Sequence, residues 1–97
     1  MQNAINYIRD RMTEPELLGQ LAEECAELAQ AALKVQRLHM PLNKPRLDES
    51  SCYDRLEEEV EDVLLCLQVL GYSSNQVIAS YKANRWASNI AENIQEV

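Results

Sequence analysis

The sequence predicts an all-α fold, with four helices in a single domain that spans residues 1–97. Three observations predict it. The dominant spacing of apolar residues is helical, no stretch sustains the alternation typical of a strand, and only two glycines and three prolines interrupt the chain. Because a chain this short buries only a modest core, we expect the bundle to be completed by association with further copies.

The first part of the chain is expected to form two helices. A short helix is expected over residues 3–12, with isoleucines and a tyrosine as its apolar side chains. The motif Thr-Glu-Pro-Glu at residues 13–16 has the spacing of a capping box, and Pro15 falls in the first turn, where its missing N–H does little harm. The second helix therefore begins at this motif and continues to about Leu38, because nothing breaks it before Pro41.

A connection and a third helix follow. Residues 39–51 contain two prolines, an asparagine, an aspartate and two serines, so a continuous helix is not expected there. Ser50 or Ser51 is the expected cap of the third helix. This helix runs to about Leu70 and ends at Gly71, a residue favoured just past a helix C-terminus.

The fourth helix is expected to begin at Ser73 or Ser74 and to run through about Ile94. A single tryptophan at helical spacing most often lies in a core, so Trp86 is expected to be buried, although it could instead stack on a base. The apolar anchors of this helix are expected to be Val77, Ile78, Tyr81 and Trp86.

One carboxylate interrupts the apolar stripe of each central helix. Steps of three and four place Glu24 among Leu17, Leu21, Leu28, Ala31, Val35 and Leu38, and they place Glu59 among Cys52, Leu56, Val63, Cys66 and Leu70. Glu27 and Asp62 follow at i+3, so each lies on the same side of its helix as the first acid. The alternative is a solvated acidic face. The second occurrence of the pattern favours convergence of the four carboxylates.

Four convergent carboxylates cannot all stay ionised unless a positive charge lies between them. The simplest such charge is a divalent metal, and carboxylate oxygens are the ligands of Mg²⁺, which Mn²⁺ could replace. Di-iron bundles have similar geometry but use Glu-x-x-His motifs, and His39 is the only histidine. We therefore expect a Mg²⁺ site formed by Glu24, Glu27, Glu59 and Asp62.

Charge and cysteine content restrict the environment and the partners. Nine basic against 16 acidic residues give a net charge of -7, which argues against nucleic acid or an anionic membrane as a partner. Three widely spaced cysteines predict neither a disulfide framework nor a zinc site, and Cys25 and Cys66 are expected to be small core residues. Without an apolar leader or a long apolar run, a soluble, cytoplasmic protein is expected.

Taken in order, the motifs resemble those of the MazG-like nucleotide pyrophosphohydrolases, which belong to the all-α NTP pyrophosphatase superfamily. The first motif is Glu23-Glu24-Cys25-Ala26-Glu27, the second is Glu59-Val60-Glu61-Asp62, and the third is Lys82-Ala83-Asn84-Arg85-Trp86. The resemblance covers about residues 17 to 87 and is strongest to short phage-encoded members. The segment from residue 36 to 52 is long for the family.

The resemblance implies a Mg²⁺-dependent hydrolase that cleaves a nucleoside triphosphate between its α and β phosphates, as a dimer or tetramer. The four carboxylates would hold the metal and orient the attacking water. Lys82 and Arg85 would bind phosphates, while Gln20 and Trp86 are further candidates for substrate contact. Two alternatives remain: a non-catalytic helical module that mediates dimerisation or interaction, and a nucleotide binder without turnover.

Overall fold

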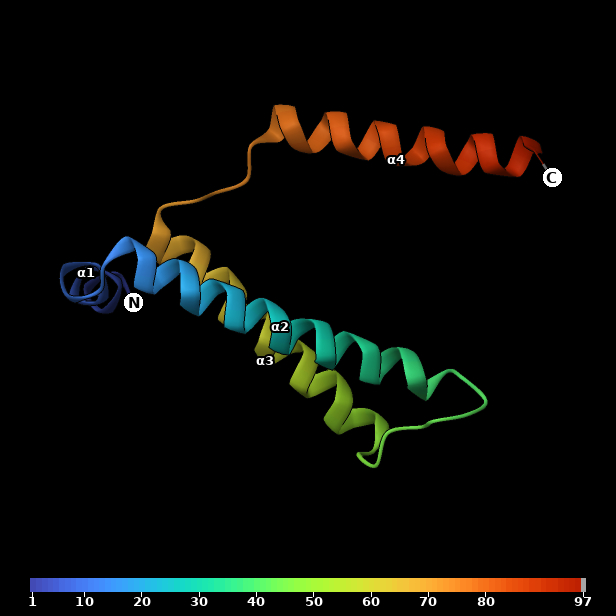
Figure 1. The fold of residues 1–97 in the computed structure, drawn as a ribbon, viewed down its shortest axis with the longest axis horizontal. Helices are drawn as coiled ribbons and strands as arrows, with labels where there is room; N and C mark the ends of the chain where they lie inside the picture. The colour runs from blue at the N-terminus through green and yellow to red at the C-terminus, as the bar shows by residue number, and fades with distance from the viewer. Residues whose placement is uncertain (97) are drawn as a thin grey trace.

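The structure, a computed structural model, describes the backbone of residues 1–96 and the side chains of residues 1–93. These residues form four helices and no strand: α1 (Gln2–Arg11), α2 (Glu14–Leu38), α3 (Glu49–Leu70) and α4 (Gln76–Glu96). Figure 1 shows α2 and α3 side by side as an antiparallel pair, with α1 across one end of the pair and α4 set apart. The expected all-α fold with four helices is confirmed for this part of the chain.

The caps of α2 and α3 are formed by residues that precede each helix. Thr13 forms the expected capping box, because its hydroxyl accepts from the Glu16 N–H (3.3 Å) and the Glu16 carboxylate accepts from the Thr13 N–H (3.3 Å). The expected serine cap of α3 is wrong. Asp48 is the cap, and its carboxylate accepts from the N–H of Ser51 at 2.9 Å. Residues 50 and 51 thus lie in the first turn of α3, which begins at Glu49.

The connection between α3 and α4 begins at Gly71, whose φ of 89° lies in the left-handed region that glycine adopts readily. The chain then leaves the α2–α3 pair in an extended segment, which Figure 1 shows between the end of α3 and the start of α4. Neither Ser73 nor Ser74 caps α4, contrary to expectation. The side-chain oxygen of Asn75 accepts from the N–H groups of Val77 (3.1 Å) and Ile78 (3.2 Å), because Asn75 immediately precedes the helix.

Helix α1 closes one end of the α2–α3 pair. Ile5 is 1% exposed and packs in a cluster with Leu17 of α2 and Val69 of α3. The guanidinium of Arg9 donates to the carbonyl oxygens of Val69 (2.8 Å) and Gln68 (2.7 Å), which lie in the last turn of α3. These contacts fix the start of α2 and the end of α3 relative to each other.

The facing surfaces of α2 and α3 are the two stripes expected from the sequence. Within these stripes Leu17, Ala31, Cys52 and Glu59 are buried, and every other member is partly buried. The expectation of a core cysteine is wrong at Cys25, which is exposed, while Cys66 is partly buried. Cys25 follows Glu24 by one residue, a rotation of about 100° around the helix, which turns it away from the stripe.

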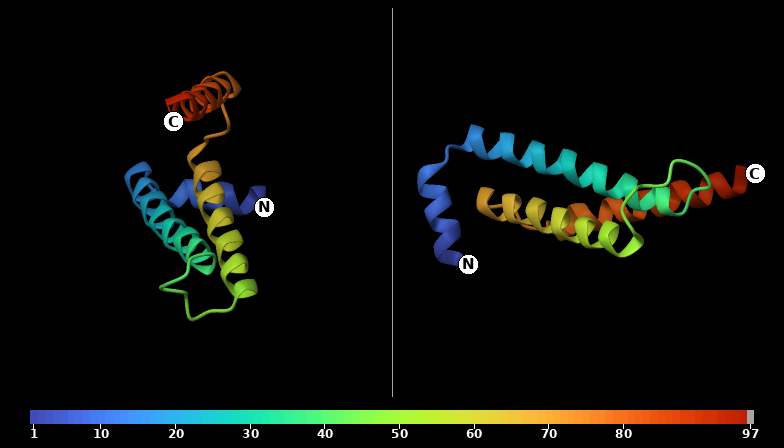
Figure 2. Two further views of the ribbon diagram at one scale, coloured as in Figure 1. Left: turned by 90° about the vertical axis from the view of Figure 1, so that its right-hand side faces the viewer. Right: turned by 90° about the horizontal axis from the view of Figure 1, so that it is seen from below.

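Helix α4 packs on none of the other three described helices. The left view of Figure 2 shows the same separation. The expected burial of Trp86 is therefore wrong for a single chain, in which its side chain is 72% exposed. Val77, Ile78, Tyr81 and Ile90 are exposed on the same helix. In the part of the chain that the structure describes, no helix combines the length and apolar character needed to span a bilayer.

Candidate metal centre

Three of the four expected carboxylates meet halfway along the α2–α3 pair. Glu24 and Glu27 extend from α2, and Glu59 extends from α3. One carboxylate oxygen of each lies within 4.8 Å of the corresponding oxygen of the other two. The i, i+3 spacing on α2 and the antiparallel packing of α3 produce this proximity, since each acid occupies or adjoins the stripe that faces the other helix. The three side chains therefore offer an all-oxygen donor set.

Two oxygen atoms of this group are buried without a hydrogen-bond partner among the described residues. They are Oε2 of Glu24 and Oε2 of Glu59, and the Glu59 residue as a whole is only 5% exposed. An ionised carboxylate in such a position is costly unless a cation or a donor reaches it. The orphaned oxygens and the hard donor set fit a divalent cation such as Mg²⁺.

The other carboxylate oxygen of Glu24 and of Glu59 has one neighbour on its own helix. The Gln20 amide donates to Oε1 of Glu24 at 2.9 Å, and Arg55 Nη2 lies 3.6 Å from Oε1 of Glu59. The Arg55 side chain is more than half exposed, so its ion pair only partly offsets the burial of Glu59. Both contacts leave the second oxygen of each carboxylate free to bind a further group.

The local environment favours protonation of the carboxyl groups of Glu24, which is partly buried, and of Glu59, which is buried. Burial raises the pKa of Glu24, the hydrogen bond from Gln20 opposes this rise, and the charges of Glu27 and Asp62 add to it. Burial also raises the pKa of Glu59, and Glu27 adds to that rise while Arg55 opposes it. A cation bound between these carboxyls would oppose both rises, because an opposite charge favours the ionised form.

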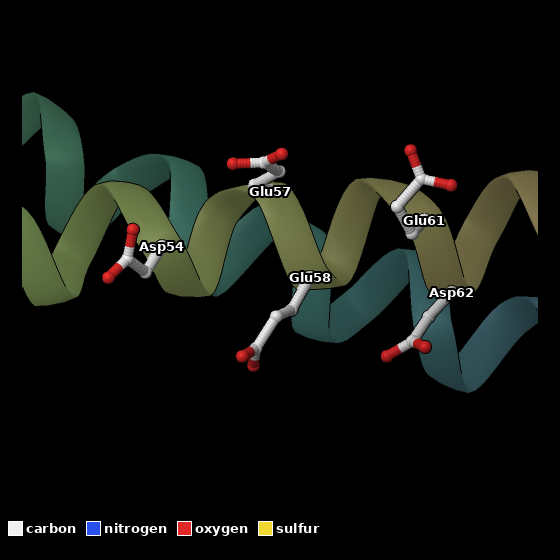
Figure 3. A pocket seen from close by; sticks show the side chains of 5 residues that line it. All are labelled: Asp54, Glu57, Glu58, Glu61 and Asp62. Atoms are coloured by element: carbon white, nitrogen blue, oxygen red, sulfur yellow. The ribbon is translucent and has the colours of Figure 1, made fainter.

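Asp62 lies beside the trio and is not one of its members. Its side chain is exposed, but its charge contributes to the raised pKa of both Glu24 and Glu59. With Gln20 and Glu24 it lines a largely apolar cavity of about 250 Å³. A second hollow of about 470 Å³ has a wholly acidic lining from α3, drawn in Figure 3: Asp54, Glu57, Glu58, Glu61 and Asp62. Asp62 thus adjoins the trio, the apolar cavity and the acidic face.

The basic candidates lie elsewhere in the single chain. Lys82, Arg85 and Trp86 are on α4, where they line a separate hollow of about 400 Å³ with Tyr81 and Asn89. Because α4 packs on none of the other described helices, one chain does not bring these residues to the carboxylates. Their presence at the site requires the α4 helix of another copy or a movement of this one.

Arg55 is a residue of the site that the sequence reasoning missed. Its position four residues before Glu59 places it on the same face of α3, and this spacing was the available signal.

The assembled group can hold a divalent cation with up to three carboxylates and can accept a proton from water. Comparison of the chain with protein-family models, curated proteins and solved structures finds no match.

Proposed function

We propose that the protein is a Mg²⁺-dependent nucleoside triphosphate pyrophosphohydrolase of the MazG-like type. It would convert a ribo- or deoxyribonucleoside triphosphate and water into the monophosphate and pyrophosphate. The observation that carries the proposal is the trio Glu24, Glu27 and Glu59, two of whose buried oxygens have no hydrogen-bond partner in the part of the chain that the structure describes. The proposed substrate follows from the resemblance of the three motifs, in order on three helices, to those of the MazG-like enzymes.

The residues of the centre have separable roles in this reaction. Glu24, Glu27 and Glu59 would hold the cation, and Asp62 adjoins them on the solvent side. When bound, Mg²⁺ would neutralise charge on the phosphate oxygens and make the attacking water more acidic. A carboxylate of the group orients the attacking water and takes its proton. A P–O bond forms at the α phosphorus, and the bond from that phosphorus to the bridging oxygen breaks, releasing pyrophosphate.

We propose a positioning role for Gln20, because its amide donates to one oxygen of Glu24 at 2.9 Å while the other oxygen has no hydrogen-bond partner among the described residues. A side chain fixed in this way loses less rotamer freedom when the cation binds. The substrate contact expected for Gln20 from the sequence stays a prediction, and Gln20 also lines the apolar cavity beside Asp62.

We propose further that the active unit is a homo-oligomer, a dimer or tetramer, in which α4 packs on another copy. Exposed apolar side chains along α4, among them Val77 at 81%, Tyr81 and Trp86, are costly for a lone chain in water. Lys82 and Arg85 on the same helix complement the acidic face of α3. Such packing would bring two phosphate-binding cations to the carboxylates. The free cysteines Cys25, Cys52 and Cys66 fit a reducing cytoplasm.

The test is pyrophosphate release from a panel of canonical and modified nucleoside triphosphates, with Mg²⁺ and with EDTA. The proposal expects Mg²⁺-dependent release in a one-to-one ratio with the monophosphate. Glu24→Gln and Glu59→Gln should each abolish it, whereas Glu49→Gln, the same change at an exposed position of α3 outside the acidic hollow, should retain it. Near-native rates in both site variants would show that the carboxylates are not the catalytic centre.

A second candidate is a helical interaction module without catalysis, which the unpartnered apolar side chains of α4 favour. In that case the protein should assemble through α4 but release no pyrophosphate from any triphosphate. A third behaviour, tight nucleotide binding without turnover, would appear in the same experiment as nucleotide retained on the protein with no product.

A further inference from the structure

Four of the chain's nine basic residues line one cavity of about 340 Å³, at the opposite end of the α2–α3 pair from α1. Lys34 and Arg37 come from the last turns of α2, and Lys44 and Arg46 come from the connection to α3. The remaining lining residues are Asn43, Pro45 and Leu47. None of the described residues that line this cavity is acidic, although the chain as a whole has a net charge of -7.

The connection that forms one wall of this cavity is tied to the helices at several points. The Lys44 ammonium donates to the carbonyl of Leu38 at the end of α2 (2.7 Å). His39 and Tyr53 share a hydrogen bond between the imidazole Nε2 and the phenol oxygen (3.1 Å), which joins the start of the connection to α3. At its far end the Cys52 thiol donates to the carbonyl of Leu47 (3.8 Å), so the connection is held at its start, its middle and its end.

The charge gathered here exceeds what the adjacent helix end can neutralise. A helix C-terminus carries roughly half a negative charge, and Lys44 already lies against it, whereas the cavity has four cationic side chains. Among the described residues, the one ion pair joins Arg55 to Glu59, so no carboxylate pairs with any of the four. Lys34 and Arg37 are also partly buried, which increases the cost of leaving like charges together.

We propose that this cavity is a binding site for a small phosphate-bearing anion. Two guanidinium groups and two ammonium groups match phosphate oxygens, with the arginines able to bind them bidentately. The volume is at the lower end of those that hold small ligands, and no aromatic residue lines the wall, so the recognised group is the phosphate itself. The acidic remainder of the protein disfavours a long polyanion such as nucleic acid.

The site is separate from the carboxylate trio and does not depend on the proposed reaction. Lys34 follows Glu27 by seven residues, about two turns and roughly 10 Å along α2. Phosphate bound here requires no metal, because the positive charge is supplied by side chains. Binding measured in EDTA therefore does not depend on a metal at the trio, and the variants below assign it to this cavity rather than to Lys82 and Arg85 on α4.

The experiment is isothermal titration of the full chain with inorganic pyrophosphate, in EDTA and 150 mM salt, as a buffer condition of roughly physiological ionic strength. The expected result is saturable binding with one site per chain. The double variant Arg37→Gln/Arg46→Gln should weaken it at least tenfold. The matched control Arg11→Gln removes a cation from α1, outside the cavity, and should bind as the wild type does. Circular dichroism establishes that each variant is folded.

Amide chemical shifts supply a second readout that needs no variant. Pyrophosphate should perturb the amides of residues 34–47 and leave those around the trio unchanged. Parallel titrations with inorganic phosphate and a nucleoside monophosphate distinguish a bare phosphate ligand from a nucleotide. Absence of saturable binding for all three anions overturns the proposal, as does equal weakening in the Arg11 control. A short oligonucleotide that binds more tightly than every small anion through the same arginines also overturns it.

Discussion

Replacing Glu59 by glutamine is expected to change stability in opposite directions with and without Mg²⁺. In EDTA at pH 7 the variant should be the more stable protein. The pKa of Glu59 is raised above its ordinary value of 4.5, chiefly by burial, so ionisation of this carboxyl disfavours the folded state. The amide retains the shape of the side chain and removes one of three charges whose oxygens lie within 4.8 Å of each other.

Mg²⁺ should reverse that order. Free Mg²⁺ at ten times its Kd adds RT ln 11, about 1.4 kcal/mol, to the free energy of unfolding. For a domain of 97 residues this corresponds to a rise in Tm of roughly 6–11 °C. Loss of one of three ligands should weaken Mg²⁺ binding at least tenfold. At the same Mg²⁺ concentration the variant then gains at most RT ln 2, about 0.4 kcal/mol of unfolding free energy, or roughly 2–3 °C in Tm.

The assay is thermal unfolding by circular dichroism at a fixed protein concentration, over a series of Mg²⁺ concentrations. Glu49→Gln is the control, since it removes the same charge from an exposed position of α3 outside the acidic hollow and should gain as much from Mg²⁺ as the wild type. The reasoning is refuted if Glu59→Gln has the higher Tm at every Mg²⁺ concentration, or if the Glu49 variant loses the Mg²⁺ response equally.

Three further outcomes are expected. Lowering the pH from 7 toward 4.5 in EDTA should narrow the difference in Tm between the wild type and Glu59→Gln. The pKa of Glu59 is raised in the folded state, so protonation of this carboxyl favours folding. Thermal melts across this pH range test this, and a wider difference at low pH would contradict a raised pKa for Glu59. Arg85→Ala should raise KM for the triphosphate at least tenfold, from loss of a charge-assisted phosphate contact, whereas Arg11→Ala should not; steady-state kinetics measure both. Trp86→Ser should weaken self-association at least tenfold, because this side chain is largely exposed in one chain and would be buried in the proposed assembly. Tyr7→Ser on α1 should not weaken it, and sedimentation over a concentration series compares the two variants.

The sequence was sufficient for the helices and for most of the candidate centre, because both depend on periodicity. The stripe that places Leu17 and Ala31 inside also places Glu24 at the interface, and the same argument applies to Cys52 and Glu59 on α3. Periodicity is less informative at stripe edges. It grouped Asp62 with the trio, but the carboxylate oxygens that lie within 4.8 Å of one another belong to Glu24, Glu27 and Glu59.

Caps and long-range packing were harder to predict. Asp48 and Asn75 displaced the expected serines, because several residues able to cap stood within three positions of each helix start and only the backbone geometry selects one. The position of α4 could not be predicted either. An apolar face predicts that a helix packs, but it does not say on which surface, and in one chain Trp86 packs on none of the other helices.

The extended connection from Gly71 to Asn75 has a consequence for how the protein forms. Packing of α2 on α3 joins helices adjacent in the chain and needs no other molecule, so this hairpin can form in a fast, unimolecular step. Burial of α4 in the proposed assembly requires an encounter between chains and is therefore second order. The carboxylate trio belongs to the first step and the α4 cations to the second. Metal affinity would then be acquired at any dilution, whereas turnover would appear only above the concentration at which chains associate.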